Sequence, residues 1–115
     1  MNLKDFKGRL GELLSAILLI LKGYRIIERR YKTKYGEIDI IVANKSTIVF
    51  VEVKFRQTTE AGFNAITQRQ LARIINASEM YIIRRSKYQT LERRYDVILV
   101  SNWFSLKHIT NVTMI

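Results

Sequence analysis

The first part of the chain shows hydrophobic residues at helical spacing. Between residues 3 and 22 they stand three or four positions apart, at Leu3, Phe6, Leu10, Leu13, Leu14, Ile17, Leu18 and Leu21. Because an α-helix has 3.6 residues per turn, this spacing predicts an amphipathic helix that packs on the core of the protein. Gly23 is the residue at which we expect the helix to end.

After Gly23 the pattern becomes typical of strands. Three segments are rich in isoleucine, valine, tyrosine and phenylalanine, namely 24–33, 36–43 and 47–55. The short polar joint at 44–46 suits a hairpin between the second and third of them.

The second half of the chain repeats both patterns. A polar stretch at 56–64 leads to helical spacing over 65–84, and a basic joint follows at 84–94. A strand is expected at 95–100 and a final one near 106–112. The order predicts an α/β fold in which helices cover a mixed sheet.

Length and composition agree with one domain spanning residues 1–115. The chain has 48% hydrophobic residues and no cysteine, which excludes disulfides, thiolate zinc sites and a cysteine nucleophile. Its longest apolar run covers residues 13–21, whereas a membrane-spanning helix needs about 20 residues. We therefore expect a cytoplasmic protein that does not bind a membrane.

The chain is strongly basic, with 20 lysines and arginines against 10 acidic residues and a net charge of +10. Such a surplus indicates a polyanionic partner such as nucleic acid. The basic residues that we expect to bind it are Arg25, Arg29, Arg30, Lys32, Lys34, Arg56, Arg69 and Arg73. The alternative for each cluster is an ordinary solvated face.

Charged residues interrupt two of the expected strands. Glu37 and Asp39 lie in GEIDIIV, and Glu52 and Lys54 lie in IVFVEVKF. Because strand side chains alternate, each pair should share one face. A hairpin centred between residues 45 and 46 would place Asp39 opposite Glu52, where two like charges repel unless a cation lies between them.

Carboxylates without histidine or cysteine are hard ligands that suit Mg²⁺ or Mn²⁺. We expect Asp39 and Glu52 to hold the ion, with the backbone carbonyl of Val53 as a further oxygen ligand. Lys54 would orient or help to deprotonate the attacking water and stabilise negative charge on a scissile phosphate. The alternative is structural: an edge-strand ion pair between Glu52 and Lys54, and an arginine partner for Asp39.

The segments GEIDIIV and VFVEVKFR resemble those of the uncharacterised bacterial YraN-like family (UPF0102). That family is a branch of the restriction-endonuclease-like, PD-(D/E)xK nuclease superfamily, which includes the archaeal Holliday junction resolvases. The similarity extends over most of the chain, including Gly8–Glu12 and Tyr95–Val97. It departs from the family's usual pattern at Arg30 and Gln70, where Asn and Lys are common. Ile38 replaces the Pro that is nominal for the superfamily, a departure that this family commonly shows.

The resemblance implies a restriction-endonuclease-like three-layer core, a mixed β-sheet flanked by helices. It makes Asp39 and Glu52 metal ligands, Lys54 the catalytic lysine, and Glu12 an additional acid reaching the site from the first helix. It further implies a Mg²⁺-dependent endonuclease acting on structured or branched DNA, similar to a Holliday junction resolvase. A homodimer is expected by analogy with those resolvases.

A second hypothesis retains the scaffold without catalysis, as a non-catalytic nucleic-acid-binding protein. The two differ at the acids, because neutralising them would improve binding but abolish cleavage.

Two other residues are expected outside the mechanism. Asp96 should have a structural role, either as a cap at the start of its strand or as a partner of Arg93 or Arg94, and His108 should lie at the surface or on an edge strand.

Overall fold

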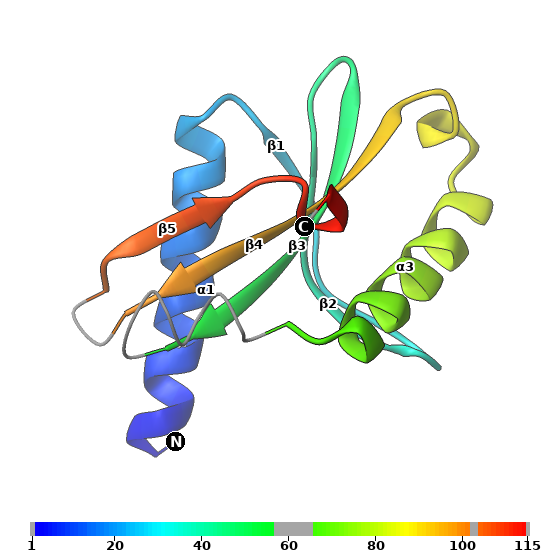
Figure 1. Cartoon of the computed structure of the whole chain (residues 1–115). Helices are drawn as coiled ribbons and strands as arrows, with labels where there is room; N and C mark the ends of the chain where they lie inside the picture. Colours follow the sequence, from blue (N-terminus) through cyan, green and yellow to red (C-terminus); the bar gives the residue numbers. More distant parts are fainter. Residues whose placement is uncertain (1, 57–65, 102–103, 115) are drawn as a thin grey trace.

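Five strands form one mixed sheet between two helices (Figure 1). The computed structural model describes residues 2–56, 66–101 and 104–114. In chain order the elements are α1 (Leu3–Leu21), β1 (Arg25–Thr33), β2 (Gly36–Ala43), β3 (Thr47–Phe55), α3 (Gln68–Ile83), a 3-10 turn (Ser86–Tyr88), β4 (Glu92–Val100), β5 (Leu106–Ile109) and a second 3-10 turn (Val112–Met114).

The strands lie in the order β1-β2-β3-β4-β5. Neighbours are antiparallel except β3 and β4, which are parallel. A parallel pair needs a crossover connection, and α3 lies within it. The α/β class and the mixed sheet flanked by helices are therefore confirmed.

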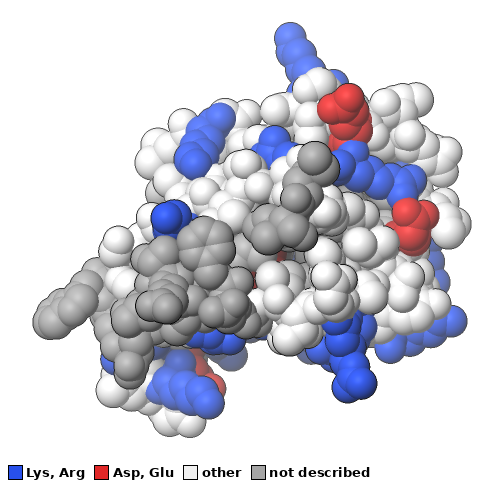
Figure 2. Space-filling view, in the orientation of Figure 1, with Lys and Arg blue, Asp and Glu red and all other residues white. Residues whose placement is uncertain are grey.

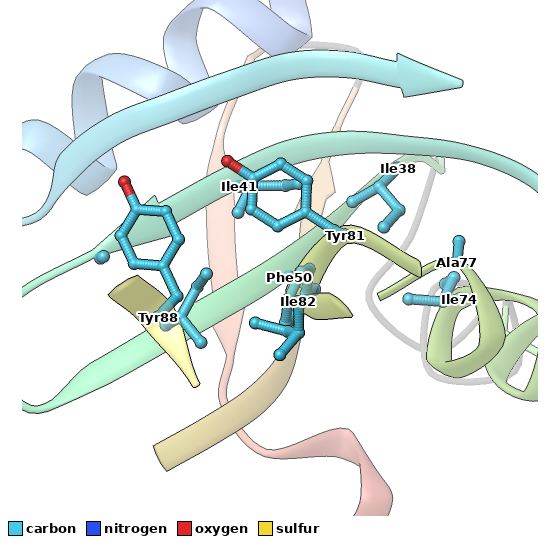
Figure 3. Packing of buried hydrophobic residues seen from close by; sticks show 10 residues of the cluster. Ile38, Ile41, Phe50, Ile74, Ala77, Tyr81, Ile82 and Tyr88 are labelled. Carbon is cyan, nitrogen blue, oxygen red and sulfur yellow. The ribbon is translucent and has the colours of Figure 1, made fainter. Parts of the chain in front are cut away.

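One face of the sheet packs against α3 (Figure 3). Ile41 and Phe50 of the sheet contact a cluster that includes Ile74, Ala77 and Tyr81 of the helix. The Tyr81 ring meets Phe50 edge-on, with the ring centroids 6.4 Å apart. This side of the core is rich in aromatic side chains and holds α3 over β1, β2 and β3.

The opposite face packs against α1, but not through the side of the helix that the spacing predicted. The buried residues of α1 are Gly11, Ser15, Ala16 and Leu19. Small side chains let the helix approach the sheet closely, and the Ser15 hydroxyl donates to the Gly11 carbonyl at 2.8 Å. The expected core positions Leu3, Phe6, Leu13, Ile17 and Leu21 are exposed.

Most predicted element boundaries agree with the structure. Lys22 caps the end of α1, and Gly23 follows with a φ of +96°, which glycine adopts without strain. The bounds of β2 and β3 are those expected. The second helix begins at Gln68, capped by Thr67, whereas the expected start at Ala65 lies outside the described residues.

The late strands differ from the prediction. β4 begins at Glu92 rather than Tyr95, because residues 92–94 continue the parallel ladder opposite Thr47–Val49. β5 ends at Ile109, where its pairing with Val97 ends. Across the described ranges, no helix is long and apolar enough to cross a membrane.

Candidate active site

The sheet forks where β2 and β3 separate. Their ladder runs only from Ala43↔Ile48 to Ile40↔Val51. Beyond it, the start of β2 pairs with β1 alone and the end of β3 pairs with β4, and the two strand ends diverge in Figure 1. Asp39 and Glu52 are the next residues in this register, so the expected juxtaposition agrees with the observed pairing.

Asp39 bridges the fork with its side chain. Its Oδ2 accepts a hydrogen bond from the Val53 backbone N–H at 2.8 Å, in the place where the ladder would have continued. Because the N–H and C=O of an extended residue point to the same side of a strand, the Val53 carbonyl also faces the fork. The fork thus presents a carboxylate and a carbonyl oxygen from neighbouring strands.

The backbone of β2 is irregular at Asp39. Ile38 packs in the cluster beneath α3, whereas Ile40 packs in the cluster beneath α1. Two residues that are two positions apart would share a face in a regular strand. The strict alternation expected for Glu37 and Asp39 is therefore interrupted at the residue that turns toward β3.

The two acids in the fork are hard to ionise together. Burial, followed by the charge of Glu52, raises the pKa of Asp39 from 3.8 to about 8. Burial also raises the pKa of Glu52, although Lys54 opposes this effect. The two carboxyl groups are close enough to share a proton, which is the usual result when like charges meet away from water.

Lys54 lies beside this pair. Its Nζ is 3.3 Å from Glu52 Oε1, and both side chains are less than one fifth exposed. The ion pair of the structural alternative is therefore present, but β3 is a central strand and not an edge strand. The arginine partner suggested by that alternative is replaced, in the described part of the chain, by the Val53 N–H.

A pocket of about 130 Å³ opens between β3 and α3 beside Glu52. Glu52 and Lys54 line it from the sheet, and Gln70 and Arg73 line it from the helix. Glu37, near the start of β2, also lines it, whereas Asp39 does not. Gln70 also accepts a hydrogen bond from the Thr67 N–H as part of the helix cap, so the α3 terminus and the pocket are coupled.

Glu12 approaches the fork from α1. Its charge contributes to the raised pKa values of Asp39 and Glu52, yet its carboxylate is held by Arg30, with Nε 3.2 Å from Oε1. Arg30 has a left-handed backbone, with a φ of +54°. Within the described residues, no group of three or more histidine and acidic side chains is close enough to hold a metal ion.

The basic residues expected to bind nucleic acid do not form one patch. Arg73 lines the acidic pocket, and Arg29 and Arg30 border a separate hollow with Arg9. Arg25 lies at the other end of β1, in a hollow with residues 85 and 87. On the face in Figure 2, lysines and arginines are scattered in separate groups.

The remaining expected positions are also dispersed. Lys32, Lys34 and Arg69 are exposed, the first two near the β1–β2 turn and the third on α3. Arg56 is half-buried, and its Nη1 donates to the Phe55 carbonyl at 2.7 Å. Only part of the expected basic surface therefore lies next to the acids.

A second polar cluster lies on the α1 side of β4. Asp96 is 1% exposed and accepts hydrogen bonds from both Arg94 and His108, and the latter also contacts Lys22. The predicted pairing of Asp96 with arginine is confirmed. His108 does lie on an edge strand, but its side chain is only 3% exposed. An acid inside an apolar strand indicates that a basic partner lies nearby. The sequence could not show that His108 is one of the partners, because β5 brings it there.

The donor set in the fork fits a hard divalent cation. Two carboxylates and one backbone carbonyl are oxygen ligands of the type that Mg²⁺ and Mn²⁺ prefer. The raised pKa values indicate that the pair lacks sufficient compensating positive charge. Asp39, Glu52 and Val53 are therefore the residues that could hold a metal, and Glu12 could join them only by leaving Arg30.

Comparison with known proteins identifies relatives over most of the chain. It is 40% identical to a UPF0102 protein of Sinorhizobium medicae, covering 96% of this chain and 92% of that protein. It is 44% identical to one of Rhodopseudomonas palustris, covering 82% and 72%. The sequence pattern of the uncharacterised protein family UPF0102 matches residues 11–100. The chain therefore belongs to this family.

Proposed function

We propose that this protein is a metal-dependent endonuclease that hydrolyses phosphodiester bonds in structured or branched DNA. The observation that carries the proposal is the pair of partly buried carboxyl groups, Asp39 and Glu52, at the sheet fork with Lys54 beside them. The mixed sheet between two helices is compatible with a restriction-endonuclease-like core. The similarity of the strand segments to PD-(D/E)xK nucleases, including archaeal Holliday junction resolvases, supports the same assignment.

The residues of the fork divide the work of hydrolysis. Asp39 and Glu52 would hold Mg²⁺ or Mn²⁺, which supplies Lewis acidity toward a phosphate oxygen when bound. Asp39 is anchored by the Val53 N–H, so its carboxylate has a fixed direction. Lys54 orients the attacking water and stabilises the negative charge that develops on the phosphate.

Arg73 contributes from the opposite wall of the pocket. Its side chain lines the same pocket as Glu52 and Lys54 and is exposed to solvent. A guanidinium there can pair with a phosphate of the substrate backbone. The net charge of +10 favours approach of DNA, while the acids at the fork keep phosphate away until a cation is bound.

A cleavage assay tests this proposal. Wild-type protein is incubated with labelled four-way junction, flap, single-stranded and duplex DNA in Mg²⁺, Mn²⁺ or EDTA. Cleavage is expected with either metal and not with EDTA. Asp39→Asn and Lys54→Ala should each lower the rate roughly 100-fold or more, because the first removes a metal ligand and the second removes the group that stabilises charge on the phosphate. Lys45→Ala, in the β2–β3 turn, is the matched control and should retain the wild-type rate.

Binding measurements separate the nuclease from a non-catalytic nucleic-acid-binding protein. That protein would bind DNA without metal, more tightly after Asp39→Asn, because one repulsive charge is removed. Such binding, with no cleavage of any substrate by pure wild-type protein, would overturn the proposed activity.

A further inference from the structure

One side of α1 carries a row of apolar side chains turned to solvent. Leu3, Phe6 and Ile20 are more than half exposed, and Leu13 and Ile17 are 45% and 43% exposed. This side faces away from the sheet, because the helix docks through the small residues around Ser15. We call the row the α1 stripe and define it by the residues Leu3, Phe6, Leu10, Leu13, Ile17 and Ile20.

The α1 stripe has the spacing of a coiled-coil seam. Its members are separated alternately by three and four positions, from Leu3 to Ile20. This repeat places apolar side chains along one line of a helix, where they can interlock with a second helix of the same spacing. A second copy of this chain supplies such a helix.

The exposed apolar surface is large enough for a dimer. The exposed fractions of the stripe residues, including 69% for Leu3 and 53% for Ile20, correspond to roughly 500 Å² of apolar area on each copy. Two copies would bury about 1,000 Å², the size that a specific interface between proteins should reach. A patch of this size lies at the upper end of what single-chain proteins leave uncovered.

The charges on α1 select the direction of pairing. Lys4, Lys7 and Arg9 lie in the first half of the helix together with Asp5 and with Glu12, which pairs with Arg30. Residues 13–21 carry no charge, and Lys22 beyond them contacts His108. Parallel helices would bring the two basic ends together, at an electrostatic cost. Antiparallel helices instead place each basic end beside the uncharged end of its partner.

We propose that this protein forms a two-fold symmetric homodimer through antiparallel packing of the α1 stripes. Leu10 and Leu13 lie at the symmetry axis, Phe6 packs opposite Ile17 of the other copy, and Leu3 packs opposite Ile20. Such an interface is isologous, since each copy contributes the same residues. This dimer does not rest on the proposed nuclease activity.

The arrangement also has a consequence for the fork. Glu12 lies near the middle of the α1 stripe, so the two copies of its site would lie on either side of the axis. With helices packed 8–10 Å apart, the two Glu12 side chains would be within about 20 Å of each other. The pockets lined by Glu52 and Lys54 open beneath α3, on the other face of each sheet, and therefore lie farther from the axis than Glu12.

Solution mass measurements test the dimer. Sedimentation velocity of the full chain at about 100 μM should give twice the 13.6 kDa of one chain. Leu13→Lys should raise the dissociation constant roughly 100-fold, because it places two ammonium groups at the axis. Ile17→Lys should weaken it as well. Ile83→Lys, at an exposed apolar position on α3, is the matched control and should remain dimeric.

Cross-linking tests the direction independently of folding defects. The chain has no cysteine, so single-cysteine variants give no background. Leu13→Cys should form a disulfide-linked dimer under mild oxidation. Leu3→Cys should not, because its two copies would lie about 25 Å apart along the helices.

Three results would overturn the proposal. They are a monomeric wild-type protein, a dimer that Leu13→Lys leaves intact, and equal cross-linking of Leu3→Cys and Leu13→Cys, which requires a parallel pair. The same solutions are mixed with vesicles of equal phosphatidylglycerol and phosphatidylcholine. A monomer that binds these vesicles through α1 would assign the stripe to an anionic lipid surface instead.

Discussion

Neutralising Asp39 should stabilise the protein at alkaline pH in the absence of metal. In the folded protein the pKa of Asp39 is about 8, against an ordinary value of 3.8. Asp39→Asn removes the carboxyl charge and keeps an oxygen that can accept the Val53 N–H. The variant is more stable because a neutral amide does not pay the desolvation cost of a buried charge and is not repelled by Glu52.

The sign and size follow from proton binding. Between pH 4 and pH 8 the unfolded chain releases the Asp39 proton and the folded chain retains it, so the free energy of unfolding falls as pH rises. At 1.36 kcal/mol for each pH unit, the upper limit of this loss is about 6 kcal/mol. Because the carboxyl retains some solvent and shares its proton with Glu52, we expect about 2 kcal/mol at pH 9.

Thermal unfolding followed by circular dichroism measures this effect. In EDTA at pH 9, Asp39→Asn should unfold about 8 °C higher than wild type, given about 4 °C per kcal/mol for a domain of this size. At pH 4 the two proteins should differ little. Asp5→Asn, an exposed acid on α1, is the matched control and should give a small difference at both pH values. An Asp39→Asn protein no more stable than wild type at pH 9 would refute the reasoning.

Three further predictions concern metal, the Asp96 cluster and α1. At pH 8, Mg²⁺ at about ten times its dissociation constant should stabilise wild type by about 1.4 kcal/mol in a thermal melt and leave Glu52→Gln unchanged. Asp96→Asn should cost about 3 kcal/mol in urea unfolding, because Arg94 and His108 lose their buried anionic partner. Burial would raise the pKa of Asp96, but hydrogen bonds from these residues hold it below its usual range, so the difference from Asp96→Asn should shrink on acidification. Gly11→Ala should add about 0.5–1 kcal/mol, since its methyl group would lie 3.4 Å from Val100 without overlap. A loss of stability in that variant would show that α1 cannot accept one carbon at the sheet.

Local pattern was sufficient to predict the hairpin and its register. The alternation in β2 and β3 and the short joint at 44–46 place Asp39 opposite Glu52, and the pairing of Ile40 with Val51 agrees. Acids inside apolar strands likewise indicated a special site and a partner for Asp96. These inferences succeed because strand periodicity and the cost of burying charge act over a few residues.

Interactions between distant segments decided the rest. Residues 92–94 join β4 because Thr47–Val49 lie beside them, and His108 is buried because β5 brings it to Asp96. The ladder ends after Ile40, which frees the Asp39 side chain to reach Val53. None of these contacts has a local signature.

The orientation of α1 shows the same division. Hydrophobic spacing alone predicted that a helix forms over residues 3–22, and it does. Both sides of that helix are apolar, so periodicity could not decide which one faces the sheet. The close approach permitted by Gly11, Ser15 and Ala16 decided it, and this leaves Leu13 and Ile17 exposed. The sequence by itself determined where the helix forms and how the β2–β3 hairpin pairs. Packing between elements determined which side chains form the core and which remain available for a partner.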